Sequence, residues 1–202
     1  MSCEKALQSS PFAVVIGGML VFLDFEASSL GKRSYPIEVA WVFEDGRSEA
    51  HLLRPAPDWD DWDPAAEAIH HIPRATLLAE GEAHDAVAQR MVEVLTDHDL
   101  LASAPSWDGK WLSTLLRAAG LPRHSLRLRD TDTARREAAR AVLEPHVPPA
   151  QLDATIEDLL VHADMRDRAR PAHRALADAQ EERDRWLAVR AAAAAHIAGD
   201  QG

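Results

Sequence analysis

Five side chains of this 202-residue sequence have the types and spacing that suit divalent metal ions held beside a histidine base. Asp24 and Glu26 stand two residues apart in an apolar run. Asp108 also has apolar neighbours, and His173 precedes Asp178 by five residues. Burying an ionised carboxylate costs several kcal/mol, roughly, unless an opposite charge lies close. A divalent metal is the usual compensation, and such residue sets serve two-metal phosphodiester chemistry.

The segment that carries Asp24 and Glu26 is rich in Leu, Val and Phe over residues 19–25, which predicts a buried strand. Because successive strand side chains point to opposite faces, the two carboxylates should share one face. They would repel each other there unless a cation lay between them, and Mg²⁺ or Mn²⁺ prefer such oxygen ligands. The alternative is that one or both are solvated at a strand end. For an isolated Asp-x-Glu, that alternative is favoured.

His173 and Asp178 need a particular helix start to meet. On a regular helix, residues five apart lie about 140° apart around the axis, so they would not share a face. Pro171 indicates that the last helix begins near it, which places His173 in or before the first turn. From there the imidazole could lean toward a site that Asp178 reaches from the helix. Alone, this pair is weak evidence in a sequence with 10 histidines.

The elements that must position these residues are predicted from apolar periodicity and turn signals. Residues 19–25, 37–43 and 49–53 predict three strands in meander order, with a hairpin turn at 44–46. Further along, the pattern predicts short strands at 100–104 and 126–128, and helices at 64–70, 82–98, 111–119, within 131–170, and from near Pro171 to Ile197. We therefore expect one α/β domain over residues 19–202, with a mixed sheet flanked by helices and a C-terminal helix. Residues 1–18 are expected to be an N-terminal extension, with Met19 as an alternative start.

The composition, with 47% hydrophobic and 27% charged residues, is that of a soluble globular protein. A net charge of −11 argues against a broad basic surface for long duplexes, whereas a short or single-stranded substrate needs fewer phosphate contacts. Cys3 is the only cysteine, so neither a disulfide framework nor a thiolate metal site is expected, and the cytoplasm is the default compartment. The apolar run at residues 11–23 is too short to span a bilayer, so no membrane partner is expected.

Taken in order, the motifs resemble those of the DEDDh exonucleases, the superfamily of polymerase proofreading subunits, ribonuclease T and oligoribonuclease. The three main motifs are matched by Leu23-Asp24-Phe25-Glu26-Ala27-Ser28, by Ser106-Trp107-Asp108-Gly109-Lys110-Trp111-Leu112, and by the segment from His173 to Asp178. Weaker similarities are Tyr35-Pro36-Ile37-Glu38-Val39-Ala40 and Ala68-Ile69-His70-His71-Ile72. The resemblance covers residues 19–188, and its strength lies in the order and spacing of the three motifs.

The resemblance implies a ribonuclease H-like fold that holds two divalent ions, Mg²⁺ or Mn²⁺, through Asp24, Glu26, Asp108 and Asp178. His173 would be the general base. The implied activity is 3′→5′ exonucleolytic hydrolysis of short or single-stranded DNA or RNA, with release of nucleoside 5′-monophosphates. Several relatives are dimers, so a homodimer is one expected state. The alternatives are a non-catalytic nucleic-acid-binding module, a subunit of a polymerase complex, and a phosphatase acting on small nucleotides.

The resemblance also implies which residues contact the terminal nucleotide, and here the sequence departs from the family. The implied contacts are Ala27, Ser28, His70, His71, Ile72 and Trp107. Ala27-Ser28-Ser29 stands where relatives often have Thr-Thr-Gly, and His71 stands where glycine is expected in a His-Gly-Ile loop. These departures concern substrate preference and leave the metal ligands intact.

Other side chains have a functional and a structural interpretation. Trp59 and Trp62 could stack on bases, but covering a core edge is the favoured role, and packing is also favoured for Trp107 and Trp111. The basic run at residues 166–170 could guide phosphates or be a solvated helix face. Asp130 and Asp132 have several arginines nearby in the sequence, which favours surface ion pairs over metal binding.

Overall fold

The computed structural model describes residues 18–166 and 172–199, with no side chains described at 164–166. Residues 1–17 of the expected N-terminal extension lie outside the described residues. So do Pro171, at which the last helix is predicted to begin, and the part of the basic run at residues 167–170. Among the described residues, no helix combines the length and the apolar character needed to cross a membrane.

The chain forms strands and helices in mixed order. They are β1 (Leu20–Ala27), β2 (Pro36–Phe43), β3 (Ser48–Arg54), α1 (Pro64–His70), α2 (Arg74–Glu80), β4 (Glu82–Ala83), α3 (His84–Leu95), β5 (Asp99–Ala102), α4 (Pro105–Ala118), β6 (Leu128–Asp130), α5 (Thr131–Leu143), α6 (Pro149–Arg166) and α7 (Ala175–Gly199).

The strands make one mixed sheet in the order β4-β3-β2-β1-β5-β6. β1, β2 and β3 form the predicted antiparallel meander, while β5 pairs parallel to β1 and β6 parallel to β5. β1 thus lies between two partners, and its register with β2 shifts at Glu26/Ala27. Because β1 is hydrogen-bonded to a strand on each side, the polar residues near its end are held in a fixed position. The prediction of a mixed sheet flanked by helices is confirmed.

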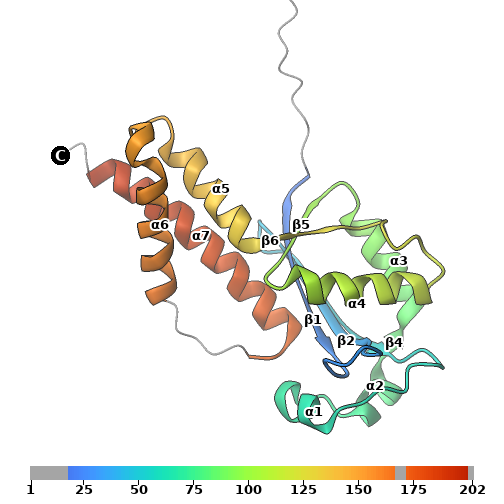
Figure 1. Cartoon of the computed structure of the whole chain (residues 1–202). Coiled ribbons are helices and arrows are strands. Elements are labelled where there is room, and N and C mark those ends of the chain that lie inside the picture. Colours follow the sequence, from blue (N-terminus) through green and yellow to red (C-terminus); the bar gives the residue numbers. More distant parts are fainter. Residues whose placement is uncertain (1–17, 167–171, 200–202) are drawn as a thin grey trace, which may run out of the picture.

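The two faces of the sheet are covered by different helices. α3 and α4 pack on one face, and α7, with α5 and α6 beside it, packs on the other (Figure 1). Alternation along β1 matches this division. Leu23 and Phe25 belong to the main core on the α3/α4 side, whereas Phe22 packs with Leu101 and Trp186 on the α5/α7 side. Asp24 and Glu26 follow Phe22 by two and four residues, so their side chains lie on the same face of β1, the face that packs against α7.

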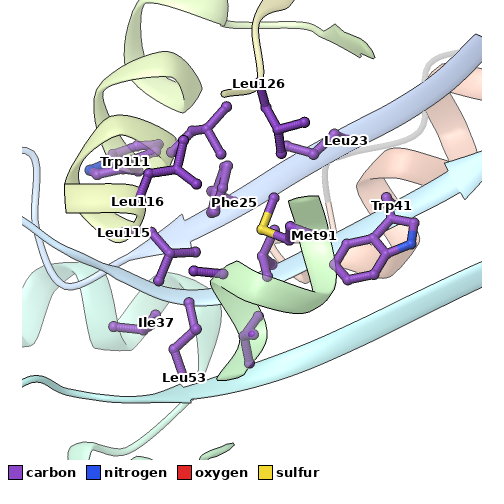
Figure 2. Packing of buried hydrophobic residues seen from close by; sticks show 14 of the residues in the cluster. Leu23, Phe25, Ile37, Trp41, Leu53, Met91, Trp111, Leu115, Leu116 and Leu126 are labelled. Carbon is purple, nitrogen blue, oxygen red and sulfur yellow. The ribbon is translucent and has the colours of Figure 1, made fainter. Parts of the chain in front are cut away.

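The main core fills the space between the sheet and the α3/α4 pair. Figure 2 shows Leu23, Phe25 and Ile37 from the sheet meeting Met91 of α3 and Leu115 of α4. Ile37, Met91 and Leu115 are fully buried. Full burial of side chains of this size stabilises the fold by about 1.5–3 kcal/mol each. This core fixes β1 relative to α4, and both elements carry candidate site residues.

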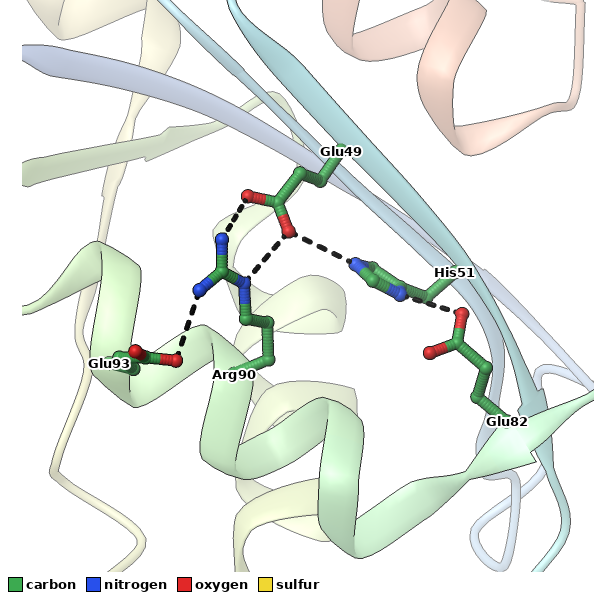
Figure 3. A network of polar contacts seen from close by, with 5 residues as sticks. All are labelled: Glu49, His51, Glu82, Arg90 and Glu93. Atoms are coloured by element: carbon green, nitrogen blue, oxygen red, sulfur yellow. Dashed lines mark hydrogen bonds and ion pairs between the residues drawn. The ribbon is translucent and has the colours of Figure 1, made fainter.

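A polar network ties α3 to the outer strand of the meander (Figure 3). Arg90 of α3 donates to both carboxylate oxygens of Glu49, at 2.9 and 3.0 Å, and to Glu93 at 3.0 Å. His51 is stacked on Trp41, and its Nδ1 lies 2.8 Å from Glu82. The network is largely at the surface, so its contribution is orientation of α3 more than stability.

Three details differ from the sequence-based predictions. α4 begins at Pro105 and not at Trp111, because proline fits the first helical position and the interior Gly109 weakens the helix signal. α7 begins at Ala175, later than the predicted start near Pro171. The short elements α2 and β4 were not predicted.

Candidate active site

A cavity of 380 Å³ opens where β1, the first turn of α4 and the first turns of α7 meet. Its lining contains all five residues singled out by the sequence, which are Asp24, Glu26, Asp108, His173 and Asp178. They come from three segments far apart in the chain. The sheet brings β1 beside β5, and the short connection after β5 leads directly into α4.

Asp108 lies in the first turn of α4 and is 2% exposed. Its Oδ2 atom is buried without a hydrogen-bond partner among the described residues. Burial raises the pKa of Asp108 from 3.8 to about 7. A buried carboxylate oxygen without a partner has a large free-energy cost unless a cation or a proton satisfies it.

Glu26, His173 and Asp178 each direct one ligand atom toward a common point. These three atoms, two carboxylate oxygens and a ring nitrogen, lie within 4.8 Å of one another. Oxygen and imidazole donors at such separations fit a divalent ion. The oxygens of Glu26 and Asp178, together with the unpartnered oxygen of Asp108, fit the metal ions that the sequence predicts, and His173 lies beside them.

His173 lies before the first residue of α7, in a left-handed backbone conformation with φ of 52°. Asp178, four positions into the range of α7, accepts a hydrogen bond at Oδ1 from the backbone N–H of Ala172, at 2.8 Å. This bond folds the segment that bears His173 back over the helix start. The two residues meet because His173 is outside the helix, as the sequence spacing requires.

A half-buried ion pair anchors the start of α7 to the sheet. Glu38 of β2 is 4% exposed and accepts a bidentate pair of hydrogen bonds from Arg174, the shorter of which is 2.7 Å. The same carboxylate accepts from the backbone N–H of Ala175 at 2.9 Å, which satisfies one of the free donors at the helix N-terminus. Glu38 thereby fixes the residues on either side of Arg174, including His173.

The pocket gathers several carboxyl groups in a small space. The pKa of Asp24 is raised well above 3.8, first by burial and then by Asp108, Glu26 and Asp178. Burial, followed by Asp178 and Glu38, raises the pKa of Glu26 to about 8. Without a cation the carboxyl groups therefore compete for protons, as expected for groups that share a site.

A further acidic residue, Glu182, lines the pocket and was missed by the sequence interpretation. It follows Asp178 by four residues on α7, so both lie on one helix face, and this spacing is a signal that could have identified it. Burial raises the pKa of Glu182, whereas Arg185, which donates to it at 2.8 Å, acts in the opposite direction. Glu182 also adds to the field that raises the pKa of Asp24.

Of the residues implied to contact the terminal nucleotide, only Trp107 lines the pocket. Trp107, which is 39% exposed, lines the pocket together with Leu30, which is 70% exposed and was not predicted. Ala27 and Ser28 are buried, and Ser28 Oγ accepts a hydrogen bond from the Tyr35 N–H at 3.1 Å. Neither Ala27 nor Ser28 is among the residues that line the pocket.

The segment His70-His71-Ile72 lies at the end of α1 and does not line this pocket either. His70 is buried and its Nδ1 accepts from the Ile72 N–H at 3.0 Å, while burial lowers its pKa. His71 caps α1 with φ of 57°, a left-handed conformation that glycine adopts without cost. The glycine that the resemblance leads us to expect at this position would adopt this conformation without strain. Substrate contact by this segment stays a prediction.

The structural interpretation is confirmed for Trp59, Trp62, Trp111 and Asp132, whereas Trp107, for which packing was favoured, stacks on Trp111 but is 39% exposed and lines the pocket. Trp59 is 8% exposed and stacks on Tyr35, so it covers the core edge. Trp111 is buried and donates to Ser34 Oγ at 3.0 Å. Trp62 packs against the main core. Asp132 pairs with Arg135 at 3.0 Å, whereas Asp130 is the N-cap of α5.

Fold and pocket together define an α/β protein of ribonuclease H-like architecture, and solved structures agree. The complex of E. coli exonuclease I with a dT13 oligonucleotide has 21% identity and a TM-score of 0.50, over 64% of this chain and 31% of that chain. The zinc ion bound form of the ExoI–ssDNA complex has 21% identity and a TM-score of 0.57, over 88% of this chain and 40% of that chain. The chain thus spans less than half the length of these exonuclease I chains. Neither a protein-family model nor a curated protein matches the sequence.

Proposed function

We propose that the protein is a metal-dependent 3′→5′ exonuclease that hydrolyses short or single-stranded nucleic acid and releases nucleoside 5′-monophosphates. The observation that carries the proposal is the convergence of Asp24, Glu26, Asp108, His173 and Asp178 on one 380 Å³ pocket. The similarity of the fold to exonuclease I, which was solved with bound oligonucleotides, supports the same substrate class.

Asp24, Glu26, Asp108 and Asp178 would hold two divalent ions, Mg²⁺ or Mn²⁺. When bound, such ions lower the pKa of water toward neutrality and offset the charge that develops on the phosphate. The raised pKa values of Asp24, Glu26 and Asp108 support this role, because cations would replace the protons that these groups otherwise retain.

His173 would take a proton from the attacking water. The water oxygen would form a bond to phosphorus while the bond from phosphorus to the 3′ oxygen breaks. That oxygen would take a proton from solvent to become the new 3′ hydroxyl, and His173 would return its proton to solvent. A histidine suits this task because it titrates near neutral pH. His173 is exposed and lies beside Glu26 and Asp178, which would orient the ring. The exposed faces of Trp107 and Leu30 provide apolar surface for the terminal base at the mouth of the pocket.

Substitutions test the assignment. Asp24→Asn and His173→Ala should each reduce kcat by at least about 100-fold on a labelled single strand with Mn²⁺, because proton transfer and positioning contribute about this much. Glu93→Gln and His146→Ala, at exposed positions outside the pocket, are the matched controls and should keep activity within about threefold. Cleavage that both pocket variants retain would rule out the proposed site.

A further inference from the structure

A second cavity, of 530 Å³, lies on the opposite flank of the first turns of α4. Among the described residues that line it, every ionisable side chain is basic: Lys110 from α4 and Arg123, His124 and Arg127 from the connection between α4 and β6. The remaining lining residues are apolar or neutral. A cavity of one charge sign stands out in a chain with a net charge of −11.

The pairing of Arg127 differs from that of its neighbour Arg129. Arg129 forms ion pairs with Asp99 at 2.5 Å and with Glu137 at 2.6 Å, as most arginines of the described residues do with carboxylates. The side chain of Arg127 has no hydrogen bond or ion pair within the described part of the chain. Its charge is therefore available to an external anion.

The other two charged side chains of the cavity, Lys110 and Arg123, donate hydrogen bonds only to neutral groups. Arg123 donates from Nε to Nε2 of His124 at 2.9 Å, so that ring nitrogen acts as an acceptor. Lys110 donates to the carbonyl oxygen of Gly31 at 2.6 Å and to Ser34 Oγ at 2.7 Å. Within the described residues, none of these cations has a carboxylate partner. Like charges gathered without a counter-charge repel each other, and a bound anion would relieve that repulsion.

The cavity also gives an anion access to the helix itself. Gly109 lines it, and a Cβ atom at Gly109 would meet no other atom within 4 Å. Pro105, at the first helical position of α4, lines the same cavity, so the positive end of the helix dipole adds to the field. The cavity therefore combines open space, basic side chains that can donate hydrogen bonds, and a positive electrostatic potential.

The two cavities share the same short stretch of α4. Trp107, Asp108 and Trp111 line the candidate active site, while Gly109 lines the basic cavity. We propose that the basic cavity, formed by Lys110, Arg123, His124 and Arg127, binds a backbone phosphate of the nucleic acid whose 3′ end occupies the active site. The proposal rests on the proposed function, and it names where an acidic protein contacts the polyanion. A dinucleotide without a 5′ phosphate has a single phosphate, which the active site would occupy, so only a longer strand has a further phosphate for this cavity.

Binding of an oligonucleotide in the presence of a chelator tests the inference without any cleavage. The probe is a 5′-fluorescein-labelled single strand of about twelve nucleotides, titrated with the full chain and followed by fluorescence anisotropy. Arg123→Ala/Arg127→Ala should weaken binding by about tenfold and reduce the slope of log K against log salt by about 0.7 for each phosphate that the variant no longer neutralises. Arg54→Ala, at an exposed arginine outside the cavity, is the control and should have little effect.

A second pair of variants removes any ambiguity about folding. Gly109→Glu places a carboxylate in the cavity, whereas Gly109→Gln adds a neutral side chain of the same size. Glu should weaken binding at least about fivefold more than Gln, because only Glu repels the phosphate. Equal binding by both, an unchanged salt slope in the arginine double variant, or no binding by the wild-type chain would overturn the inference.

Cleavage rates separate this inference from the proposed function. In the arginine double variant, kcat/KM should fall about tenfold on the longer strand and stay within about twofold on a dinucleotide. If the wild-type chain binds in an arginine-dependent way and does not cleave, the proposed function fails and the basic cavity stands. If it cleaves both substrates and the variant does so equally well, the cavity has no role and the proposed function stands.

Discussion

Three carboxyl groups of the pocket hold protons over a pH range in which isolated carboxyl groups are ionised. Burial is the main cause for Asp24, Glu26 and Asp108 alike, and neighbouring carboxylates add to it for Asp24 and Glu26. For Glu26 the pKa rises from 4.5 to about 8. Between these values the folded chain binds more protons than the unfolded chain does, so its stability falls as pH rises.

This difference predicts a pH-dependent effect of metal. With a chelator present, Tm should fall by at least roughly 3 °C between about pH 5 and about pH 8. Mn²⁺ should raise Tm more at pH 8 than at pH 5, because it binds the ionised carboxylates. Differential scanning fluorimetry measures both effects. Glu26→Gln should flatten the decrease, and an equal slope in this variant would contradict the assigned cause.

At the residue scale, the five candidate active-site residues could be predicted because their types and order are local properties of the sequence. Glu182 and Glu38 could not be assigned in the same way. The role of Glu38 depends on a contact with Arg174, 136 residues away. One signal was nevertheless present, since Glu38 stands between Ile37 and Val39 in a strand that is buried throughout. The reasoning that selected Asp24, a carboxylate in an apolar strand, applies equally to Glu38.

Among the elements, the start of α7 depends most on a contact distant in sequence. Glu38→Ala removes the partner of both Arg174 and the Ala175 N–H, and it should lower the free energy of unfolding by about 2 kcal/mol. Because His173 then loses its fixed position, kcat should fall more than KM rises. Chemical denaturation and steady-state kinetics measure the two effects.

Glu38→Gln provides the matched comparison for this anchor. It keeps an acceptor for the Ala175 N–H and should restore part of kcat, while the Arg174 pair stays weakened. A Glu38→Ala variant that is less stable but has an unchanged kcat would show that the anchor serves only folding.

The junction after α1 gives an independent prediction at the same scale. His71 has φ of 57°, which costs a non-glycine residue about 1 kcal/mol. His71→Gly should therefore raise the free energy of unfolding by roughly 0.5 kcal/mol or more, and His71→Val should lower it. Urea denaturation of the two variants decides the sign. A destabilised glycine variant would mean that the imidazole itself makes a stabilising contact.

The meander and α1 were predicted at nearly their observed bounds because their signals are local: runs rich in apolar residues, the turn signal Glu44-Asp45-Gly46, and the cap Asp63 before Pro64. α2 and β4 are short, and β4 exists only by pairing with the end of β3. The start of α7 at Ala175 is set by a carboxylate from β2, which no local pattern reveals.

For the whole molecule, the net charge of −11 limits the substrate. Outside the basic cavity, the surface should repel a long duplex, because the charge density of a duplex exceeds that of a short single strand. We expect kcat/KM for a short single strand to exceed that for a long blunt duplex by at least about tenfold. Rates on both substrates at matched ionic strength test this, and a preference for duplex would contradict it.

The overall architecture was predictable because three ordered motifs and a meander fit few topologies, and the mixed sheet agrees. The basic cavity was not predictable. It joins Lys110 to Arg123 and Arg127 across the end of α4, and the basic residues of that connection are indistinguishable in sequence from the paired Arg129.

The most direct measurement of the central claim is product analysis on an end-labelled single strand. With Mn²⁺ or Mg²⁺, the purified full chain should shorten a 5′-labelled strand one nucleotide at a time and release the terminal nucleotide of a 3′-labelled strand first, as a nucleoside 5′-monophosphate. A chelator or Asp24→Asn should stop both reactions. Release of 5′-terminal nucleotides first, 3′-phosphate products, or no metal-dependent cleavage would contradict the account.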